Sequence, residues 1–552
     1  MHRIIIIFLL AIIATSTMAR VHEWEALQAD LGRQAAAFRN SPEHLEARNR
    51  DTRDYQVGDT NIFWRWNLSV MPPLWIQTAA TCRAVGEHCY IFVADNEWNV
   101  HMDQTDVDAV LARLEDSTVN DPSQGAIEMD VQLFGPIPDE LDNDPRLIVF
   151  YSALGSFQGT SFDGYFSPYN QVTEAQAQQM NPPGHSNLCE MIYMTCYPLD
   201  PVAPIRLSVL AHELQHLIHW GQDANEDTWL NEGCSELAMV AYGVPDPISG
   251  FNSVPDNNLT AWNQTTADYV KVMLFFTYLQ EHYDSTGMIG DLVADPANGI
   301  ASLNAQLAIH YPDTSFSDLF SNWGVANILD AGPPLNPLWG YSLLDLPNFT
   351  MTNLPVEPSM SNLGIQGYAT DYLRYTCQTS ANRHIGINIG TPIRIKEVKL
   401  ASNGECLDVT DLGESNSFLV TPPPSSEAFH VIYVLSNPNP NPVVYSLMTA
   451  VPNHDPSAPE LESLSLSANH PNPFRAQTLI QFSIREAQAL KLEVFNLRGQ
   501  KVALLVDELK AAGDHQVSWN GQDFEGKKVP AGVYLYRLTA GKTQITRRMA
   551  MY

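Results

Sequence analysis

The spacing of hydrophobic residues changes several times along the chain, and each change predicts a different kind of element. From about Asn61 short apolar runs such as 89–94 and 147–152 are separated by acidic or Gly/Pro turns, which is typical of strands. Between Ile205 and Tyr283 the spacing becomes helical. Beyond about Pro355 strand-like runs return, at 368–375, 384–389, 430–435 and 443–451. The pattern predicts a mixed α+β domain followed by a β domain.

The last part of the chain has the pattern of a separate β domain. A segment rich in Pro, Asp and Ser precedes apolar runs at 479–484, 490–495, 516–519 and 533–538, with turns such as Asn520-Gly521 between them. We expect an immunoglobulin-like sandwich over 464–552, joined by a linker over 453–463.

The first residues predict export. The apolar run from Ile4 to Ala14 follows His2 and Arg3 and is too short to cross roughly 30 Å of hydrocarbon. Residues 1–19 are therefore interpreted as a signal peptide, and no other segment is apolar and long enough to span a bilayer. Residues 20–55 are predicted as a helical segment or a pro-segment, 56–350 as the mixed α+β domain and 351–452 as a first β-sandwich domain.

The net charge of the chain limits the kinds of molecule that it can bind. The chain carries 30 Lys and Arg against 62 Asp and Glu, a formal net charge of −32, which excludes nucleic acid as an obvious partner. From Leu464 onward the balance is +5, so the residues before it carry −37. The change of sign supports a domain boundary there.

An exported chain can form disulfides. The proximity of the seven cysteines in the sequence suggests the pairs Cys82 with Cys89, Cys189 with Cys196, and Cys377 with Cys406. Cys234 is left over and is expected to be a small buried thiol.

The most informative stretch is His212-Glu213-Leu-Gln-His216. On a helix Leu210, Leu214, Leu217 and Ile218 form one buried stripe, while the two histidines lie one turn apart on another face, where both can bind one ion. Zn²⁺ suits such a site, because it accepts neutral imidazole and lowers the pKa of bound water. Glu213 is placed to take the proton from that water.

A third ligand is needed, and two candidates compete. His219 lies on the same helix, but three histidines along one helix close a tetrahedral shell poorly. The second candidate is Glu232, in a further helical stretch that also contains Asn231 and Glu236. Glu232 can bind the metal, while Glu236, one turn on, can hydrogen-bond the far nitrogen of a ligand histidine.

This combination of motifs resembles the gluzincin zinc metallopeptidases of the thermolysin-type clan, and over roughly 60–345 it is similar to the hyicolysin-like family. Glu236 stands where thermolysin-like enzymes usually have Asp. The resemblance implies that 56–350 is a zincin-like catalytic domain, that Zn²⁺ is held by His212, His216 and Glu232, and that peptide bonds are hydrolysed with Glu213 as general base. Tyr269 and His282 are candidates for the donor that stabilises the oxyanion.

An acidic turn before the strand at 147 suggests a second ion. Asp139, Asp142, Asn143 and Asp144 crowd this turn, although their spacing does not match the EF-hand loop. Ca²⁺ is therefore a second candidate cofactor, against a plain solvated turn.

The C-terminal block carries a second resemblance. His470-Pro-Asn-Pro-Phe474, Trp519-Asn-Gly521, Ala531-Gly-Val-Tyr534 and Arg547-Arg-Met549 resemble the type A sorting domain of bacterial type IX secretion, which is related to flagellar-hook-capping immunoglobulin-like domains. The resemblance implies the secretion machinery as a partner.

We therefore expect a secreted or surface-bound zinc endopeptidase that acts on proteins or peptides. One alternative is a surface adhesin or binding protein with a structural zinc ion, against which Glu213 argues. Another is an aminopeptidase of the same clan, but no Gly-x-Met-Glu-Asn-type strand is present to hold a free amine.

Overall fold

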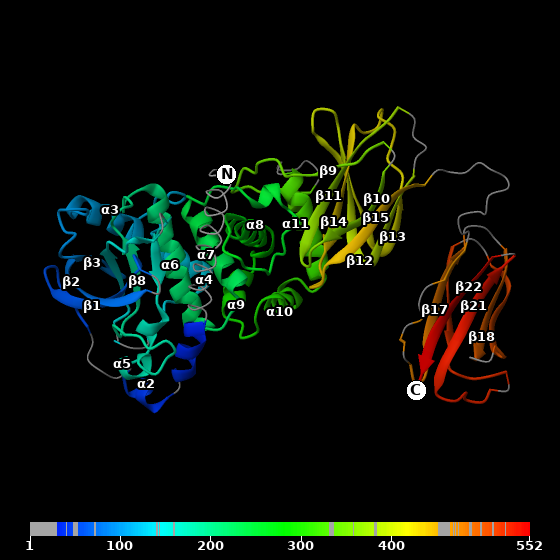
Figure 1. Cartoon of the computed structure of the whole chain (residues 1–552), viewed down its shortest axis with the longest axis horizontal. Coiled ribbons are helices and arrows are strands. Elements are labelled where there is room, and N and C mark those ends of the chain that lie inside the picture. Colours follow the sequence, from blue (N-terminus) through cyan, green and yellow to red (C-terminus); the bar gives the residue numbers. More distant parts are fainter. Residues whose placement is uncertain are drawn as a thin grey trace, which may run out of the picture. The chain divides into compact units, whose positions relative to one another are not determined.

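The computed structural model describes residues 30–450 and 464–552, apart from 40, 48–52, 71–72, 140–141, 143, 158–159, 330–335, 357, 380–383, 467–468, 470, 473, 485–487, 497–498, 511–512, 525 and 542. The predicted signal peptide, the first part of the 20–55 segment and the linker lie outside the described residues. The chain divides into two compact units, Met1–Val451 and Pro452–Tyr552, and each is described by itself (Figure 1).

A six-stranded mixed sheet opens the first unit, and it contains the strands predicted at 89–94 and 147–152. Its order is β1 (Thr60–Asn67), β2 (Leu74–Val85), β3 (Cys89–Ala94), β4 (Leu147–Ser152), β8 (Met191–Thr195) and β7 (Gly164–Phe166). The pairs β3–β4 and β4–β8 are parallel, whereas β7 runs antiparallel to β8 at the edge. The three central strands β3, β4 and β8 are buried along their whole length.

Each face of this sheet has its own hydrophobic core. Ile91 and Val93 belong to the core under α3 (Gln104–Glu115), α4 (Ala126–Phe134) and α6 (Pro204–Gln222), whereas Tyr90 and Phe92 belong to the opposite one. The second core also takes in Leu31 of a helix that includes residues 30–38. The shorter elements of this region are α2 (Pro42–Ala47), β5 (Ser156–Phe157), β6 (Thr160–Ser161), η1 (Pro168–Gln171) and α5 (Glu174–Ala177).

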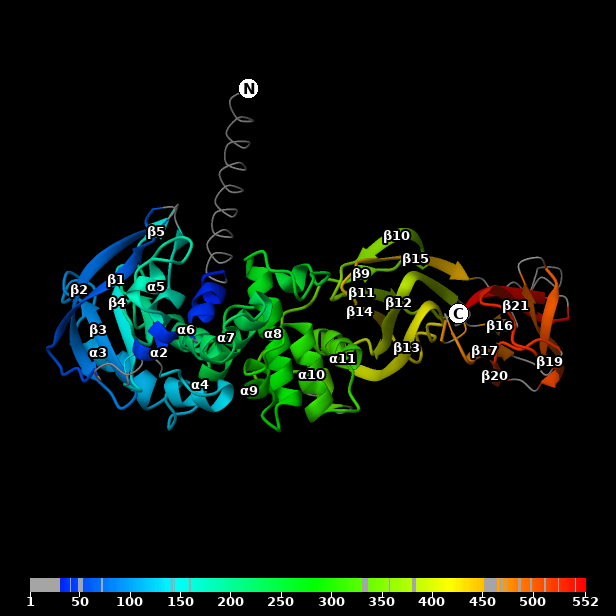
Figure 2. The ribbon, with the colours of Figure 1, turned by 90° about the horizontal axis from the view of Figure 1, so that it is seen from below.

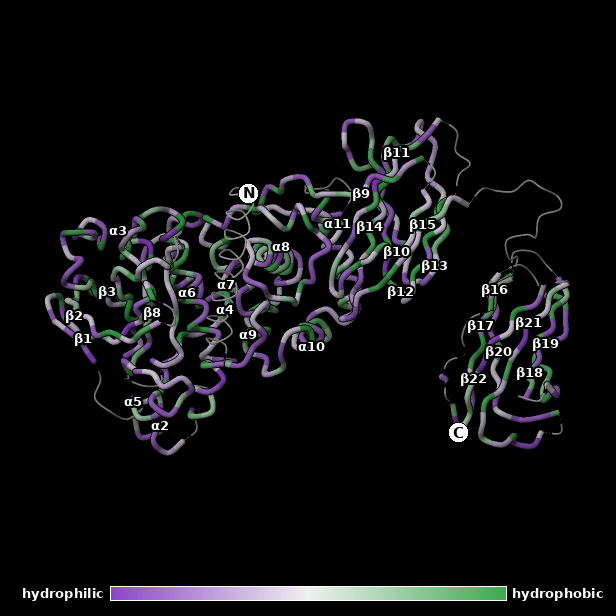
Figure 3. Tube along the Cα trace, viewed as in Figure 1, coloured by the Kyte–Doolittle hydropathy of each residue, from purple (hydrophilic) through white to green (hydrophobic). Residues whose placement is uncertain are grey.

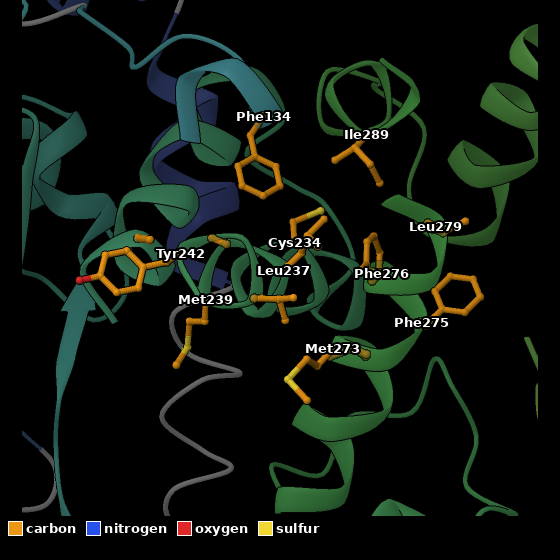
Figure 4. Packing of buried hydrophobic residues seen from close by; sticks show 14 of the residues in the cluster. Phe134, Cys234, Leu237, Met239, Tyr242, Met273, Phe275, Phe276, Leu279 and Ile289 are labelled. Carbon is orange, nitrogen blue, oxygen red and sulfur yellow. The ribbon is translucent and has the colours of Figure 1, made fainter. Parts of the chain in front are cut away.

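The predicted helical region forms a layered group beside the sheet (Figure 2). α7 (Thr228–Tyr242) packs between α6 and α8 (Thr266–Tyr283). Gly233 makes this contact close, because a Cβ there would lie 2.2 Å from the Phe276 ring. Figure 4 shows Cys234 and Leu237 of α7 among Phe134, Phe276 and other buried side chains, so the prediction of a buried Cys234 thiol is confirmed.

Further helices connect this group to the following sheet. They are η2 (Phe251–Ser253), α9 (Met288–Val293), α10 (Ile300–His310), α11 (Phe316–Leu329) and η3 (Pro337–Trp339). Figure 3 shows hydrophobic residues concentrated in α8, in keeping with its burial between neighbours.

One seven-stranded sheet completes the first unit, and it gives the predicted β domain a sandwich-like form. Six strands follow the order β10 (Ser359–Ile365), β15 (Val443–Ala450), β12 (His384–Leu400), β14 (His430–Asn437), β11 (Ala369–Thr376) and β9 (Thr352–Asn353), and β13 (Cys406–Val420) pairs with β12. Its inner face encloses a separate core. On the other face α11 packs against β12 and β14, and the Tyr372 hydroxyl donates to the Gly324 carbonyl at 2.8 Å.

The second unit has the two-sheet architecture that the sequence predicts. One sheet contains β16 (Leu464–Leu466), β17 (Thr478–Ile484) and β20 (Gly513–Trp519), and the other contains β19 (Lys501–Lys510), β18 (Gln488–Asn496), β21 (Gly532–Ala540) and β22 (Thr543–Met551). Residues from both sheets share one core, in which Trp519 is buried.

The predicted disulfides are wrong, because all seven cysteines are free. Cys82 and Cys189 belong to one core of the first sheet, and their proposed partners Cys89 and Cys196 belong to the core on the opposite face. Cys377 likewise lies in the inner core of the seven-stranded sheet, whereas Cys406 packs against the core shared with α11. Residues close in sequence thus point to opposite sides of a sheet.

No helix among the described residues has the length and apolar character needed to cross a membrane.

Candidate metal centre and active site

One face of α6 packs into the hydrophobic core, and another face carries the two candidate ligand histidines. The predicted stripe of Leu210, Leu214, Leu217 and Ile218 is fully buried in the core, which confirms this part of the sequence analysis. His212 and His216 project from another face into a cavity of about 350 Å³. The helical spacing of four residues places both imidazoles on the same face of the helix.

Glu232 on α7 meets the two histidines, as predicted. The Nε2 atoms of His212 and His216 are 3.2 Å apart, and the Glu232 Oε2 atom lies 3.6 Å from the first and 3.8 Å from the second. A tetrahedral ion with bonds of about 2.0–2.1 Å separates its ligand atoms by about 3.3 Å. The separations of the three donor atoms are therefore close to those between ligands of one tetrahedral ion.

The far nitrogens of the two imidazoles have different surroundings. His216 Nδ1 lies 2.6 Å from Asn231 Oδ1, which leaves the His216 Nε2 lone pair directed into the cavity. His212 Nδ1 is buried without a hydrogen-bond partner and lies 3.4 Å from Glu236 Oε1. Two imidazole nitrogens and a carboxylate are a donor set that fits a metal ion.

Burial keeps both histidines neutral at pH 7. It lowers the pKa of His212 to about 4, against a raising effect of Asp246, and it lowers the pKa of His216 to about 3. Burial also raises the pKa of Glu236 to about 8. Neutral imidazole is the form that binds a metal, so the ligands do not need to lose protons first.

Glu213 lies in the same cavity, next to the edge strand β7. It is 7% exposed, and its Cγ atom would lie 3.0 Å from a Cβ at Gly164. The same added Cβ would lie 2.9 Å from the Tyr193 carbonyl, a backbone atom that cannot turn away. A glycine at 164 therefore leaves the space in which the Glu213 side chain packs.

Of the two predicted oxyanion donors, only Tyr269 lines the cavity. It lies on α8, and its ring contacts that of Trp262 at 4.9 Å. His282 lies three turns further along α8 and its Nε2 is 2.9 Å from the Gly340 carbonyl, away from the ligands. His219, the rejected third ligand, is fully buried beside Gln215 and is not part of the metal group.

Sequence reasoning missed several residues of the site. Asn231 directly precedes Glu232, but its bond to His216 depends on the angle between α6 and α7. Ser235 also contacts His216 Nδ1, at 3.0 Å. The cavity wall further includes Gly164, Asp223 and Glu226, which come from a strand and a loop that no motif marks.

The acidic turn is only partly assembled as predicted. Asp139 and Asp142 gather with Glu190, whose carboxylate comes from the start of β8, within 4.8 Å of one another. Asp144 instead accepts from Arg146 Nε at 2.8 Å, and Asn143 lies outside the described residues. Ca²⁺ at this turn stays a prediction.

Comparison with known proteins identifies one part of the chain. The model of the FlgD Ig-like domain matches residues 475–544, so the C-terminal unit contains a FlgD-type immunoglobulin-like domain, as expected. No curated protein matches the chain.

Solved structures are similar only over short stretches. PorZ, an essential surface component of the type-IX secretion system of Porphyromonas gingivalis, is 17% identical over 22% of this chain and 15% of that chain, with a TM-score of 0.13. A β-glucuronidase from Ruminococcus gnavus is 10% identical over 33% of this chain and 35% of its own, with a TM-score of 0.16. The Faecalibacterium prausnitzii β-glucuronidase is 9% identical over 34% and 37%, also at 0.16. The chain thus spans well under half the length of these proteins.

Proposed function

We propose that the chain is a secreted zinc-dependent endopeptidase with a zincin-like catalytic domain and a general base at Glu213. The observation that carries this proposal is the convergence of His212, His216 and Glu232 at ligand spacing in an open cavity that also contains a carboxylate.

The three ligands would hold Zn²⁺. When bound, zinc acts as a Lewis acid on the scissile carbonyl and makes a water molecule a nucleophile near neutral pH. Asn231 and Glu236, whose side-chain oxygens lie 2.6 and 3.4 Å from the Nδ1 atoms of His216 and His212, would orient the two imidazoles toward the ion.

Glu213 supplies the proton transfers. Its carboxylate takes a proton from the attacking water as the carbon–oxygen bond forms, and gives that proton to the amine nitrogen as the peptide bond breaks. Tyr269, which lines the same cavity, is the proposed donor to the developing oxyanion.

The alternative of a binding protein with a structural zinc ion is less consistent with this geometry. Structural zinc sites are usually closed by four protein ligands, whereas the group found among the described residues contains three. A carboxylate in the same cavity has no function in a closed structural site, but it is required for hydrolysis.

The C-terminal unit would serve export. Its FlgD-type immunoglobulin-like domain and the sequence resemblance to type A sorting domains support a role as an address for the type IX machinery. The proposed location is outside the cell or on its surface.

Removal and return of the metal test the proposal. Purified chain stripped with a chelator should lose cleavage of a denatured protein substrate, and one equivalent of Zn²⁺ should restore it. His216→Ala should bind zinc much more weakly and remain inactive at that equivalent. Full activity of the stripped chain, or of His216→Ala without zinc, would contradict a metal-dependent reaction.

A further inference from the structure

The cavity wall continues along α6 beyond the metal ligands, where it includes two carboxylates that the proposed mechanism does not use. His212, His216, Trp220 and Asp223 follow one another at helical spacing, and all four line the cavity. Glu226, from the loop between α6 and α7, lines it as well. At about 1.5 Å per residue, Asp223 lies about 10 Å along the helix from His216.

Both carboxylates are buried and each has one oxygen without a hydrogen-bond partner. Asp223 is 7% exposed and Glu226 is 8% exposed. The Asp223 Oδ2 and Glu226 Oε2 atoms have no partner, whereas Glu226 Oε1 accepts from the Gly299 backbone N–H at 2.8 Å. The backbone thus holds one oxygen of Glu226, and the other is buried without a hydrogen-bond partner.

Leaving such oxygens without a cation is unfavourable. Burial raises the pKa of Asp223, and burial together with the neighbouring Asp223 charge raises the pKa of Glu226 to about 8. A cation beside the pair would stabilise both ionised forms and restore the missing hydrogen bonds.

The surroundings favour a cationic nitrogen over a metal ion. Neither carboxylate belongs to the two groups of at least three metal-ligating side chains found in the described part of the chain. None of the described lining residues is Lys or Arg, so the protein does not neutralise the pair from within the cavity. Trp220, between the metal site and the pair, has the Arg39 guanidinium 4.9 Å from its ring centroid, so this ring already contacts a cation.

We propose that Asp223 and Glu226 form an acidic subsite that binds a cationic nitrogen of the peptide substrate. This inference rests on the proposed peptidase function and adds the substrate class, namely peptides with a positive charge near the scissile bond. The distance of about 10 Å equals about three extended residues, or fewer when a Lys or Arg side chain reaches along the cavity.

The test uses the zinc-loaded full chain and pairs of internally quenched peptides. Each pair differs by Lys against norleucine, at one of the three positions on either side of the cleaved bond. Every peptide is made with a free and with an acetylated N-terminus, which separates a side-chain cation from a terminal amine. We expect kcat/KM to be at least tenfold higher for the cationic peptide at one position or terminus. Equal kcat/KM across all pairs would overturn the subsite while leaving the peptidase intact.

Substitution of Asp223 and Glu226 tests whether these two residues cause the preference for the cationic peptide. Asp223→Asn, and separately Glu226→Gln, should bring the ratio toward one by lowering cleavage of the cationic peptide and leaving the norleucine peptide within about twofold. Asp313→Asn, an exposed carboxylate on the loop before α11, is the matched control and should keep the ratio. A ratio unchanged in both variants would overturn the assignment.

A binding measurement keeps this inference separate from catalysis. Glu213→Gln loaded with zinc should bind the labelled cationic peptide at least tenfold more tightly than the norleucine peptide. If the wild type cleaves no peptide, the peptidase proposal fails, and this binding ratio still decides for or against the acidic subsite.

Discussion

At the residue scale, the proposed metal site depends on residues behind the ligands. Asn231 Oδ1 lies 2.6 Å from His216 Nδ1, and Glu236 Oε1 lies 3.4 Å from His212 Nδ1, where it can orient the imidazole once a metal is bound. The sequence predicts Glu236 in this role, because a helical turn separates it from Glu232. It does not predict Asn231, because adjacent residues on a helix point in different directions unless a neighbouring helix approaches at the right angle.

Removal of either orienting residue should weaken the metal site without abolishing it. We expect Asn231→Ala and Glu236→Ala each to reduce zinc affinity by about 10–100-fold. Competition with a chromogenic chelator measures this affinity. Asn304→Ala, an exposed residue of α10, is the control and should bind zinc as the wild type does. Unchanged affinity in both orienting variants would contradict their role.

At the element scale, sequence spacing predicts the helices, but the packing of helices and the faces of sheets determine which residues meet. The helical pattern predicts α6, α7 and α8, and the buried stripe of α6 follows from it. The cysteine pairs were wrong because proximity in sequence does not reveal which face of a sheet each thiol occupies. Gly164 could not be predicted as a site residue, since its role depends on β7 lying beside α6.

The number of free thiols can be measured directly. In denaturant without reductant, a thiol reagent should detect seven thiols per chain, since all seven cysteines are free. The three disulfides suggested by sequence proximity would leave only Cys234 reactive. A count near one would therefore contradict the structure.

The start of α8, which carries Tyr269, depends on a buried ion pair. Lys271 Nζ lies 2.6 Å from Asp268 Oδ1 and also bonds to Asn257, so it ties the preceding loop to the helix. Lys271→Met should leave the Asp268 charge buried without its cation and destabilise the first unit by about 3–5 kcal/mol. Thermal unfolding measures the loss. Lys399→Met, which breaks a partly exposed pair with Asp408, should cost about 1 kcal/mol or less.

The Lys271–Asp268 ion pair makes the stability of the first unit depend on pH. Burial acts to raise the pKa of Asp268, but Lys271 and the bonds from Thr265 outweigh it and hold that pKa below the ordinary value of 3.8. The unfolded chain then binds the proton more readily, so the stabilisation is present above about pH 4 and is lost as the pH falls below it. In Lys271→Met, burial without the cation raises the Asp268 pKa, so the stability difference between the two proteins should shrink as the pH falls below about 4. A difference that stays constant across that range would contradict this account.

At the scale of the whole molecule, the division into two units separates the proposed catalytic site from the proposed secretion signal. The ligands and the cavity lie within Met1–Val451, whereas the FlgD-type domain lies within Pro452–Tyr552. The change of charge and the proline-rich segment predict a boundary here. The composition does not reveal that the seven-stranded sheet shares a core with α11, because that contact depends on which face of each strand is turned toward the helix.

Truncation tests this division. A chain ending at residue 451 should cleave peptides within about twofold of the full chain, because the metal site is complete without the second unit. In a bacterium with type IX secretion, the truncated chain should remain inside the cell envelope, and residues 464–552 fused to a reporter should be exported. Loss of peptide cleavage by a folded, zinc-bound truncated chain would contradict the separation.

The most direct test of the central claim is the activity of Glu213→Gln with its zinc content measured in the same sample. The proposed mechanism predicts that this variant binds one zinc ion per chain and cleaves a denatured protein at least about 100-fold more slowly than the wild type, because it cannot accept the proton. Glu128→Gln, an exposed residue of α4, should retain full activity. Cleavage by Glu213→Gln at the wild-type rate would show that Glu213 is not the base and would contradict the account.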